Sequence, residues 1–84
     1  MAKPRSVRLS RAAEKALDGL EQRLLERLKS ALRGLAGDPL LGKKLKGDFE
    51  GLRSYRLGTY RIVYRFTRES LEIIYIEHRI DVYR

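Results

Sequence analysis

The chain has 84 residues, which is the length of one small domain. Its 19 lysines and arginines outnumber its 11 acidic residues, and the formal net charge of +8 favours a polyanionic partner such as nucleic acid, an anionic membrane or an acidic protein. Cysteine is absent and histidine occurs once, which excludes disulfides and thiol chemistry, and we expect neither a metal site nor a cofactor.

The N-terminal segment, MAKPRSVRLSRAAEKALDGL, is too charged to form the apolar core of a signal peptide. No apolar run approaches the roughly 18 residues of a membrane-spanning helix. We therefore expect a cytoplasmic protein without a membrane partner.

The first half of the chain predicts a short strand followed by two helices. Ser6–Leu9 is a candidate strand, and Ser10 is a favourable N-cap for a short helix over residues 11–18. Residues 21–35 carry the clearest helical pattern, because leucines recur there at a spacing of four, as at Leu20, Leu24, Leu28 and Leu32. A leucine stripe of this kind is typical of core packing.

Residues 40–51 are predicted to form a loop that contains Lys43, Lys44 and Lys46. Two interpretations of this lysine cluster stay open: a solvated basic loop, or a contact with phosphate. The loop precedes a predicted hairpin, so it could extend any positive surface that the hairpin carries.

The chain is organised around a predicted β-hairpin over residues 52–66, LRSYRLGTYRIVYRF. Gly58 would supply the positive φ of the tight turn. Because successive strand residues point to opposite faces, the four positions Tyr60, Ile62, Tyr64 and Phe66 share one face. If that face packs inward, Arg56 and Arg61 emerge side by side on the open face, with Arg65 further along it.

Residues 71–77, LEIIYIE, predict a third strand. Apolar residues would lie on both of its faces, which indicates a central position in the sheet. The sequence HRIDVYR then ends the chain. The predicted fold is α+β: a short N-terminal strand, a two-helix hairpin and a three-stranded antiparallel meander, with the helices packed on one face of the sheet, in a single domain over residues 1–84.

Two segments resemble the signature of the RelE/ParE superfamily of toxins from type II toxin–antitoxin modules, on the RelE side. In that family a Tyr-Arg-hydrophobic-hydrophobic-Tyr strand precedes an apolar strand that ends in His-Arg-x-x-Val-Tyr, and here these motifs are residues 60–64 and 78–83. A K-x-L-x-G loop, residues 43–47, also fits. The resemblance covers nearly the whole chain, although only its second half carries the motifs.

RelE-type members are endoribonucleases that cut mRNA codons in the ribosomal A site. The resemblance therefore implies a translation-inhibiting, metal-independent endoribonuclease, with the ribosome and mRNA as partners and an acidic RelB-like antitoxin in a toxin–antitoxin hetero-oligomer. Two alternatives stay open. One is a ParE-like toxin that inhibits DNA gyrase and cleaves nothing, and the other is a catalytically decayed RNA-binding relative.

The resemblance also implies site residues. Arg61 matches the hairpin arginine that contacts the scissile phosphate, and Arg79 matches the arginine after the last strand, which stabilises the same phosphate. Arg56 occupies a position where RelE proteins often have a lysine. Arginine suits charge stabilisation because its planar fork binds phosphate, but it cannot act as a base.

Tyr83 matches the tyrosine that stacks on a base and assists proton transfer. His78 has the side chain best suited to acid–base work near neutral pH, and a packing role and a catalytic role are equally open for it. The second active-site lysine of RelE would fall at Ser54, which leaves the general base unidentified. Further phosphate contacts are expected from the basic residues around the hairpin: Lys43, Lys44, Lys46, Arg53 and Arg65.

Overall fold

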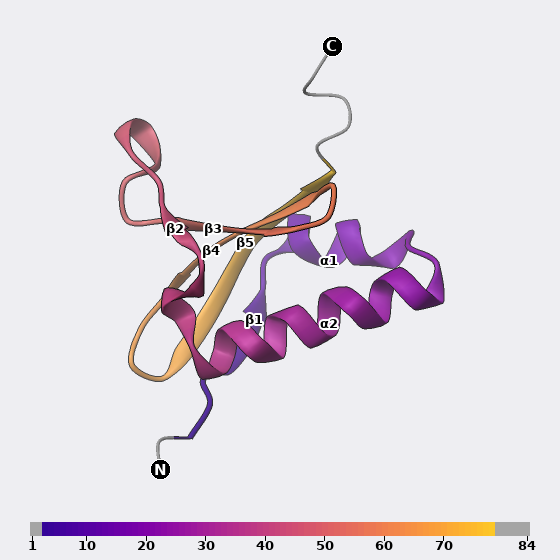
Figure 1. Cartoon of the computed structure of the whole chain (residues 1–84), viewed down its shortest axis with the longest axis horizontal. Coiled ribbons are helices and arrows are strands. Elements are labelled where there is room, and N and C mark those ends of the chain that lie inside the picture. Colours follow the sequence, from indigo (N-terminus) through magenta and orange to yellow (C-terminus); the bar gives the residue numbers. More distant parts are fainter. Residues whose placement is uncertain (1–2, 79–84) are drawn as a thin grey trace.

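Two helices cover one face of a five-stranded sheet in the computed structural model, which describes residues 3–78 (Figure 1). The elements in chain order are β1 (Ser6–Leu9), α1 (Arg11–Asp18), α2 (Gln22–Gly37), β2 (Lys43–Lys44), β3 (Arg53–Leu57), β4 (Tyr60–Phe66) and β5 (Ser70–His78), with short 3-10 turns at Pro39–Leu41 and Gly47–Phe49. The strand order is β1-β5-β4-β3-β2. Strand β1 runs parallel to β5, and the other pairs are antiparallel. The predicted α+β arrangement is confirmed.

The sheet is larger than the predicted meander because both of its edges gain a strand. Strand β1 adds to β5, and the two-residue strand β2 adds to β3. The segment 40–51, predicted to be a loop, therefore contains a strand and two 3-10 turns. Strand β2 consists of two lysines, so local propensity gives no signal for it, and its pairing with β3 creates it.

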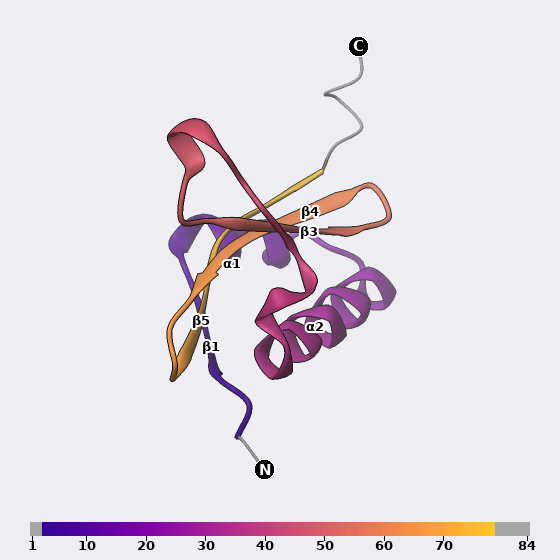
Figure 2. The ribbon, with the colours of Figure 1, turned by 60° about the vertical axis from the view of Figure 1, so that its left-hand side comes forward.

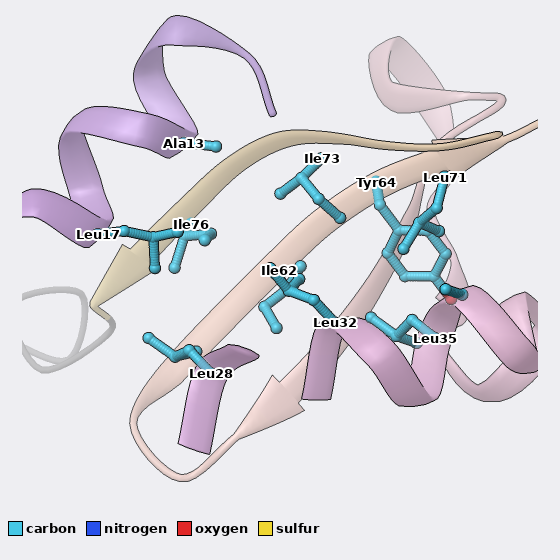
Figure 3. Packing of buried hydrophobic residues seen from close by; sticks show 11 residues of the cluster. Ala13, Leu17, Leu28, Leu32, Leu35, Ile62, Tyr64, Leu71, Ile73 and Ile76 are labelled. Carbon is cyan, nitrogen blue, oxygen red and sulfur yellow. The ribbon is translucent and has the colours of Figure 1, made fainter. Parts of the chain in front are cut away.

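The leucine stripe of α2 packs on the helix-facing side of the sheet, as its spacing predicts (Figure 3). The buried core comprises Leu28, Leu32, Leu35 and Ala36 of α2, Ala13 and Leu17 of α1, and Ile62, Tyr64, Leu71, Ile73 and Ile76 of the two central strands. Tyr60 and Phe66 share the face of Ile62 but are only partly buried. Each fully buried leucine contributes about 1.5–3 kcal/mol, so α2 is held mainly by this face.

A β-bulge in β5 explains why its sequence is apolar on both parities. Val63 pairs with Tyr75 and Tyr64 pairs with Ile73, so Ile74 has no opposite residue. The extra residue shifts the alternation. As a result, Ile73 and Ile76, which lie on either side of the bulge residue Ile74, both face the core.

Ser10 connects α1 to this bulge. Its hydroxyl accepts a hydrogen bond from the backbone N–H of Ala13 at 3.0 Å and donates one to the carbonyl of Ile74. Its own N–H donates to the carbonyl of Ile73 at 3.0 Å. The single hydroxyl thus caps a helix and satisfies a carbonyl at the irregular point of the sheet.

We expect Ser10→Ala to lower the free energy of unfolding by about 1–2 kcal/mol, because it removes the N-cap and leaves the Ile74 carbonyl without its partner. Urea unfolding followed by circular dichroism measures the loss. Ser30→Ala, at an exposed position within α2, is the control and should change the stability by less than about 0.5 kcal/mol. Equal stability of the two variants would contradict the role of Ser10.

No helix within residues 3–78 is long and apolar enough to cross a membrane.

Candidate functional site on the open sheet face

The open face is the face of the sheet opposite α1 and α2, and no α-helix of residues 3–78 covers it (Figure 2). Gly58 has a φ of +60° in the turn between β3 and β4, as the hairpin requires. The register pairs Arg56 with Arg61, and Arg61 with Glu77 of β5. The expected adjacency of the two arginines on this face is therefore confirmed, and Glu77 completes the Arg56–Arg61–Glu77 row across β3, β4 and β5.

Arg61 is ion-paired within this row. Its Nη2 forms an ion pair with a carboxylate oxygen of Glu77, and the two side chains are 27% and 34% exposed, respectively. Its Nε is buried and has no hydrogen-bond partner within residues 3–78.

A second ion pair lies on the same face between the same two strands. Arg65 Nε donates to a carboxylate oxygen of Glu72 at 2.6 Å. The Arg65 side chain is 61% exposed, more than twice as much as that of Arg61. No arginine of β3 faces it, because the pairing of β3 with β4 ends at Arg53 and Tyr64. Arg65 is thus a more solvated and more isolated cation than Arg61.

The lysine cluster divides between the two faces. Lys43 pairs with Ser54, and Lys44 pairs with Arg53, so the two lysines alternate about β2. Lys43 shares the face of Ser54. Both lysines line a groove of about 490 Å³ together with Arg56. Lys46 is exposed just before the second 3-10 turn. The groove brings both lysines close to Arg56, and Lys43 is the one that shares the face of the arginine row.

Arg53 is expected to contact phosphate. It lies on the same face of the sheet as the buried Tyr64, its partner in the register. Its guanidinium donates to the carbonyl of Gly42 from Nε at 3.1 Å and from Nη2 at 2.8 Å, and to the carbonyl of Leu40 at 3.4 Å. These bonds attach the segment before β2 to the sheet. The guanidinium of Arg53 therefore holds this segment and lies off the arginine row.

The side chain of Tyr64 also binds the segment before β2. Its hydroxyl donates to the carbonyl of Pro39 at 2.6 Å and accepts from the N–H of Gly42 at 3.0 Å. Burial raises the pKa of this hydroxyl above its ordinary value, although the hydrogen bond from Gly42 and the nearby Arg53 act in the opposite direction. The phenol therefore stays protonated and able to donate at neutral pH.

Gly42 completes this contact, which we call the Gly42–Tyr64 lock. A Cβ at this position would lie 2.5 Å from the Tyr64 hydroxyl oxygen and 2.8 Å from the carbonyl oxygen of Ser54. The lock fixes the residue immediately before Lys43. Sequence reasoning did not assign this role to Gly42 or Tyr64, and the only local signal was a glycine beside the lysine cluster.

His78 lies away from the arginine row. It pairs with Tyr60, whose ring it stacks on at 4.5 Å between centroids, and its Nε2 lies 2.9 Å from the Thr59 hydroxyl. Tyr60 and Arg61 are successive strand residues, so His78 and Arg61 occupy opposite faces of the sheet. Of the two roles left open for His78, its contacts fit packing against the hairpin turn.

Arg79 and Tyr83 lie outside the described residues. Within residues 3–78, no group of three or more His, Cys, Asp or Glu side chains is arranged to hold a metal ion. The site as described is therefore a cationic row with one carboxylate, flanked by a groove that carries Lys43.

Comparison with known proteins gives concordant matches. The family model of the ParE toxin of the type II toxin–antitoxin system parDE matches residues 7–83. Toxin RelG of Mycobacterium tuberculosis is 36% identical over 85 residues, which cover 96% of this chain and 98% of that protein. Toxin RelE of the same organism is 41% identical over 71 residues, covering 75% of this chain and 73% of that protein. A toxin–antitoxin complex, RelBE2 of M. tuberculosis, contains a chain that matches with a TM-score of 0.84 at 32% identity, over 94% of this chain and 95% of that one.

Proposed function

The chain belongs to the RelE/ParE superfamily of type II toxin–antitoxin toxins, and from this premise we propose that it cleaves translated mRNA in the ribosomal A site and so inhibits translation. The observation that carries the proposal is the placement of Arg56 and Arg61 opposite each other on adjacent strands of the open face. A phosphodiester in transesterification develops negative charge on its non-bridging oxygens. Two arginines fixed on a rigid sheet provide donors for that charge without reorganisation.

In this proposal Arg61 binds the scissile phosphate and Arg56 supplies a second positive charge. Lys43, in the groove beside Arg56, contacts a neighbouring phosphate of the mRNA. Arg79 and Tyr83, beyond the described residues, keep their expected roles in phosphate binding and base stacking. The 2′-hydroxyl is the nucleophile, and charge stabilisation comes from arginines, so the scheme needs no metal ion.

The partners follow from the family and the charge. Toxins of this family are paired with an antitoxin, and the relative in the RelBE2 structure is part of a toxin–antitoxin complex. We propose that an acidic RelB-like antitoxin neutralises this domain of net charge +8 in a hetero-oligomer. The ribosome and mRNA are the targets, which places the site of action in the cytoplasm.

Inhibition of DNA gyrase is the second candidate, and two observations favour it. The matching family model is that of the ParE toxin, and Ser54 stands where the RelE pattern has a lysine. A gyrase-binding toxin needs no converging cations on the open face, so substitution of those cations distinguishes the two functions.

The test is to express the chain from a tightly controlled promoter and to map mRNA 5′ ends by primer extension. We expect growth arrest with new ends inside translated codons, and loss of those ends with Arg61→Ala. Arg33→Ala, which removes an exposed arginine of α2, is the matched control and should retain both effects. Growth arrest with intact mRNA and reduced DNA supercoiling would overturn the proposal in favour of gyrase inhibition.

A further inference from the structure

The proposed cleavage lacks a group that removes the proton of the attacking 2′-hydroxyl. Arginines cannot accept it. Ser54 occupies the lysine position of the RelE pattern, and the contacts of His78 are on the opposite face of the sheet. Within the described strands, the only carboxylates are those of Glu72 and Glu77, both on β5.

We propose that Glu77 is the general base of the proposed ribonuclease, an inference that rests on the proposed function. Glu77 is directly opposite Arg61 in the register, and its carboxylate is ion-paired with Arg61 Nη2. Neighbouring strands lie about 4.8 Å apart. A phosphate bound by Arg61 therefore brings the adjacent 2′-hydroxyl within reach of the carboxylate that the same guanidinium holds.

The surroundings of Glu77 suit this role in two ways. The ion pair orients the carboxylate, because one oxygen is paired with Nη2. A carboxylate has a second oxygen, which can accept a hydrogen bond from a hydroxyl. The carboxylate is also accessible to RNA, because 34% of the Glu77 side chain is exposed. On the proposed RNA-binding face a negative charge beside Arg61 disfavours phosphate binding, and a role as the base gives this charge a chemical use.

Glu72 provides an internal comparison. It is on the same strand and face and pairs with Arg65, but no arginine of β3 faces that pair, whereas Arg56 faces Arg61. Of these two ion pairs, the Arg61–Glu77 pair is the one that combines a carboxylate with two adjacent cations. Glu72 has the same chemistry as Glu77 without the second cation that would help to hold the scissile phosphate.

The step balances as a transesterification. Glu77 takes the proton from the 2′-hydroxyl while the 2′-oxygen forms a bond to phosphorus. The bond from phosphorus to the 5′-oxygen breaks, and that oxygen takes a proton from water. The products are a 2′,3′-cyclic phosphate and a 5′-hydroxyl, and Glu77 returns its proton to solvent.

The experiment measures single-turnover cleavage of a defined mRNA on programmed ribosomes, with the full chain released from its antitoxin. We expect Glu77→Gln to lower the rate at saturating toxin by at least about 10²-fold, the contribution of a general base. Glu72→Gln, the matched control, should lower it by at most about fivefold, the effect of an exposed ion pair. Binding of the Glu77→Gln variant to the ribosome should be unchanged or tighter, because a negative charge is removed.

Two further arms test whether a carboxylate is needed at this position and whether it acts as a base or as an acid. Glu77→Asp keeps the carboxylate and should recover part of the rate. A substrate with sulfur in place of the 5′ leaving oxygen needs no proton on its leaving group but still needs a base, so Glu77→Gln should remain slow on it. Normal cleavage by Glu77→Gln, or full rescue by the thio substrate, would overturn the assignment of Glu77. Absence of cleavage by the unmodified protein would instead overturn the proposed function.

Discussion

Replacing Arg61 with alanine is expected to lower the rate of mRNA cleavage by about 10³–10⁵-fold, the range found where an arginine stabilises phosphoryl charge. Arg61 has Arg56 opposite it on one side and Glu77 on the other, so its loss would remove both the main phosphate contact and the group that orients the carboxylate. Arg61→Lys should recover only part of the rate, because lysine keeps the charge without the planar fork. Single-turnover cleavage on programmed ribosomes measures both variants.

The same substitution should leave the fold nearly intact. An ion pair as exposed as Arg61–Glu77 contributes about 0–1 kcal/mol, and the substitution also removes the buried Nε, which has no hydrogen-bond partner among residues 3–78. Urea unfolding should therefore show a small change for Arg61→Ala and for the control Arg33→Ala. A cleavage rate for Arg61→Ala within tenfold of the unmodified protein would contradict the role assigned to this residue.

Replacing Gly42 with alanine is expected to destabilise the protein by about 2–3 kcal/mol, because overpacking at a site without free space costs about this much. The backbone of Gly42, with φ −81° and ψ 164°, is one that alanine adopts readily, so the cost comes from contact and not from conformation. The new Cβ would approach the Tyr64 hydroxyl to 2.5 Å and the Ser54 carbonyl to 2.8 Å. Thermal and urea unfolding measure the loss.

Gly34→Ala is the matched control, since a Cβ there meets nothing within 4 Å and the position is inside α2. It should stabilise the protein by about 0.5–1 kcal/mol.

Tyr64→Phe should lower the free energy of unfolding by about 1–3 kcal/mol, because the N–H of Gly42 and the carbonyl of Pro39 lose their buried partner. In the double variant the costs should not add, because removal of the hydroxyl relieves the closest contact. Equal effects of Gly42→Ala and Gly34→Ala would contradict the lock.

Local patterns in the sequence predict most of the fold. The leucine spacing predicts α2, and the period-two alternation of the hairpin predicts the adjacency of Arg56 and Arg61, because both depend only on residues near in the chain. Strand β2 and the bulge at Ile74 were not predicted. Both arise from pairing with other strands, and nothing in their own residues encodes that pairing.

The same limit applies to the candidate site. The register of β5 against β4 pairs Glu77 with Arg61 and His78 with Tyr60, and a shift of one residue would exchange the faces of these two side chains. The sequence therefore could not tell which of them accompanies Arg61. Arg53 is a similar case, because its three bonds to backbone carbonyls depend on where the chain before β2 lies.

The most direct test of the central claim is cleavage of a defined mRNA by the purified chain, with and without ribosomes stalled at one codon, followed by mapping of the new ends. We predict cleavage inside the A-site codon on the ribosome, with a 2′,3′-cyclic phosphate on the upstream fragment, and none when the cleaved nucleotide lacks its 2′-hydroxyl. Intact mRNA on the ribosome, together with inhibition of gyrase supercoiling by the same preparation, would contradict the claim.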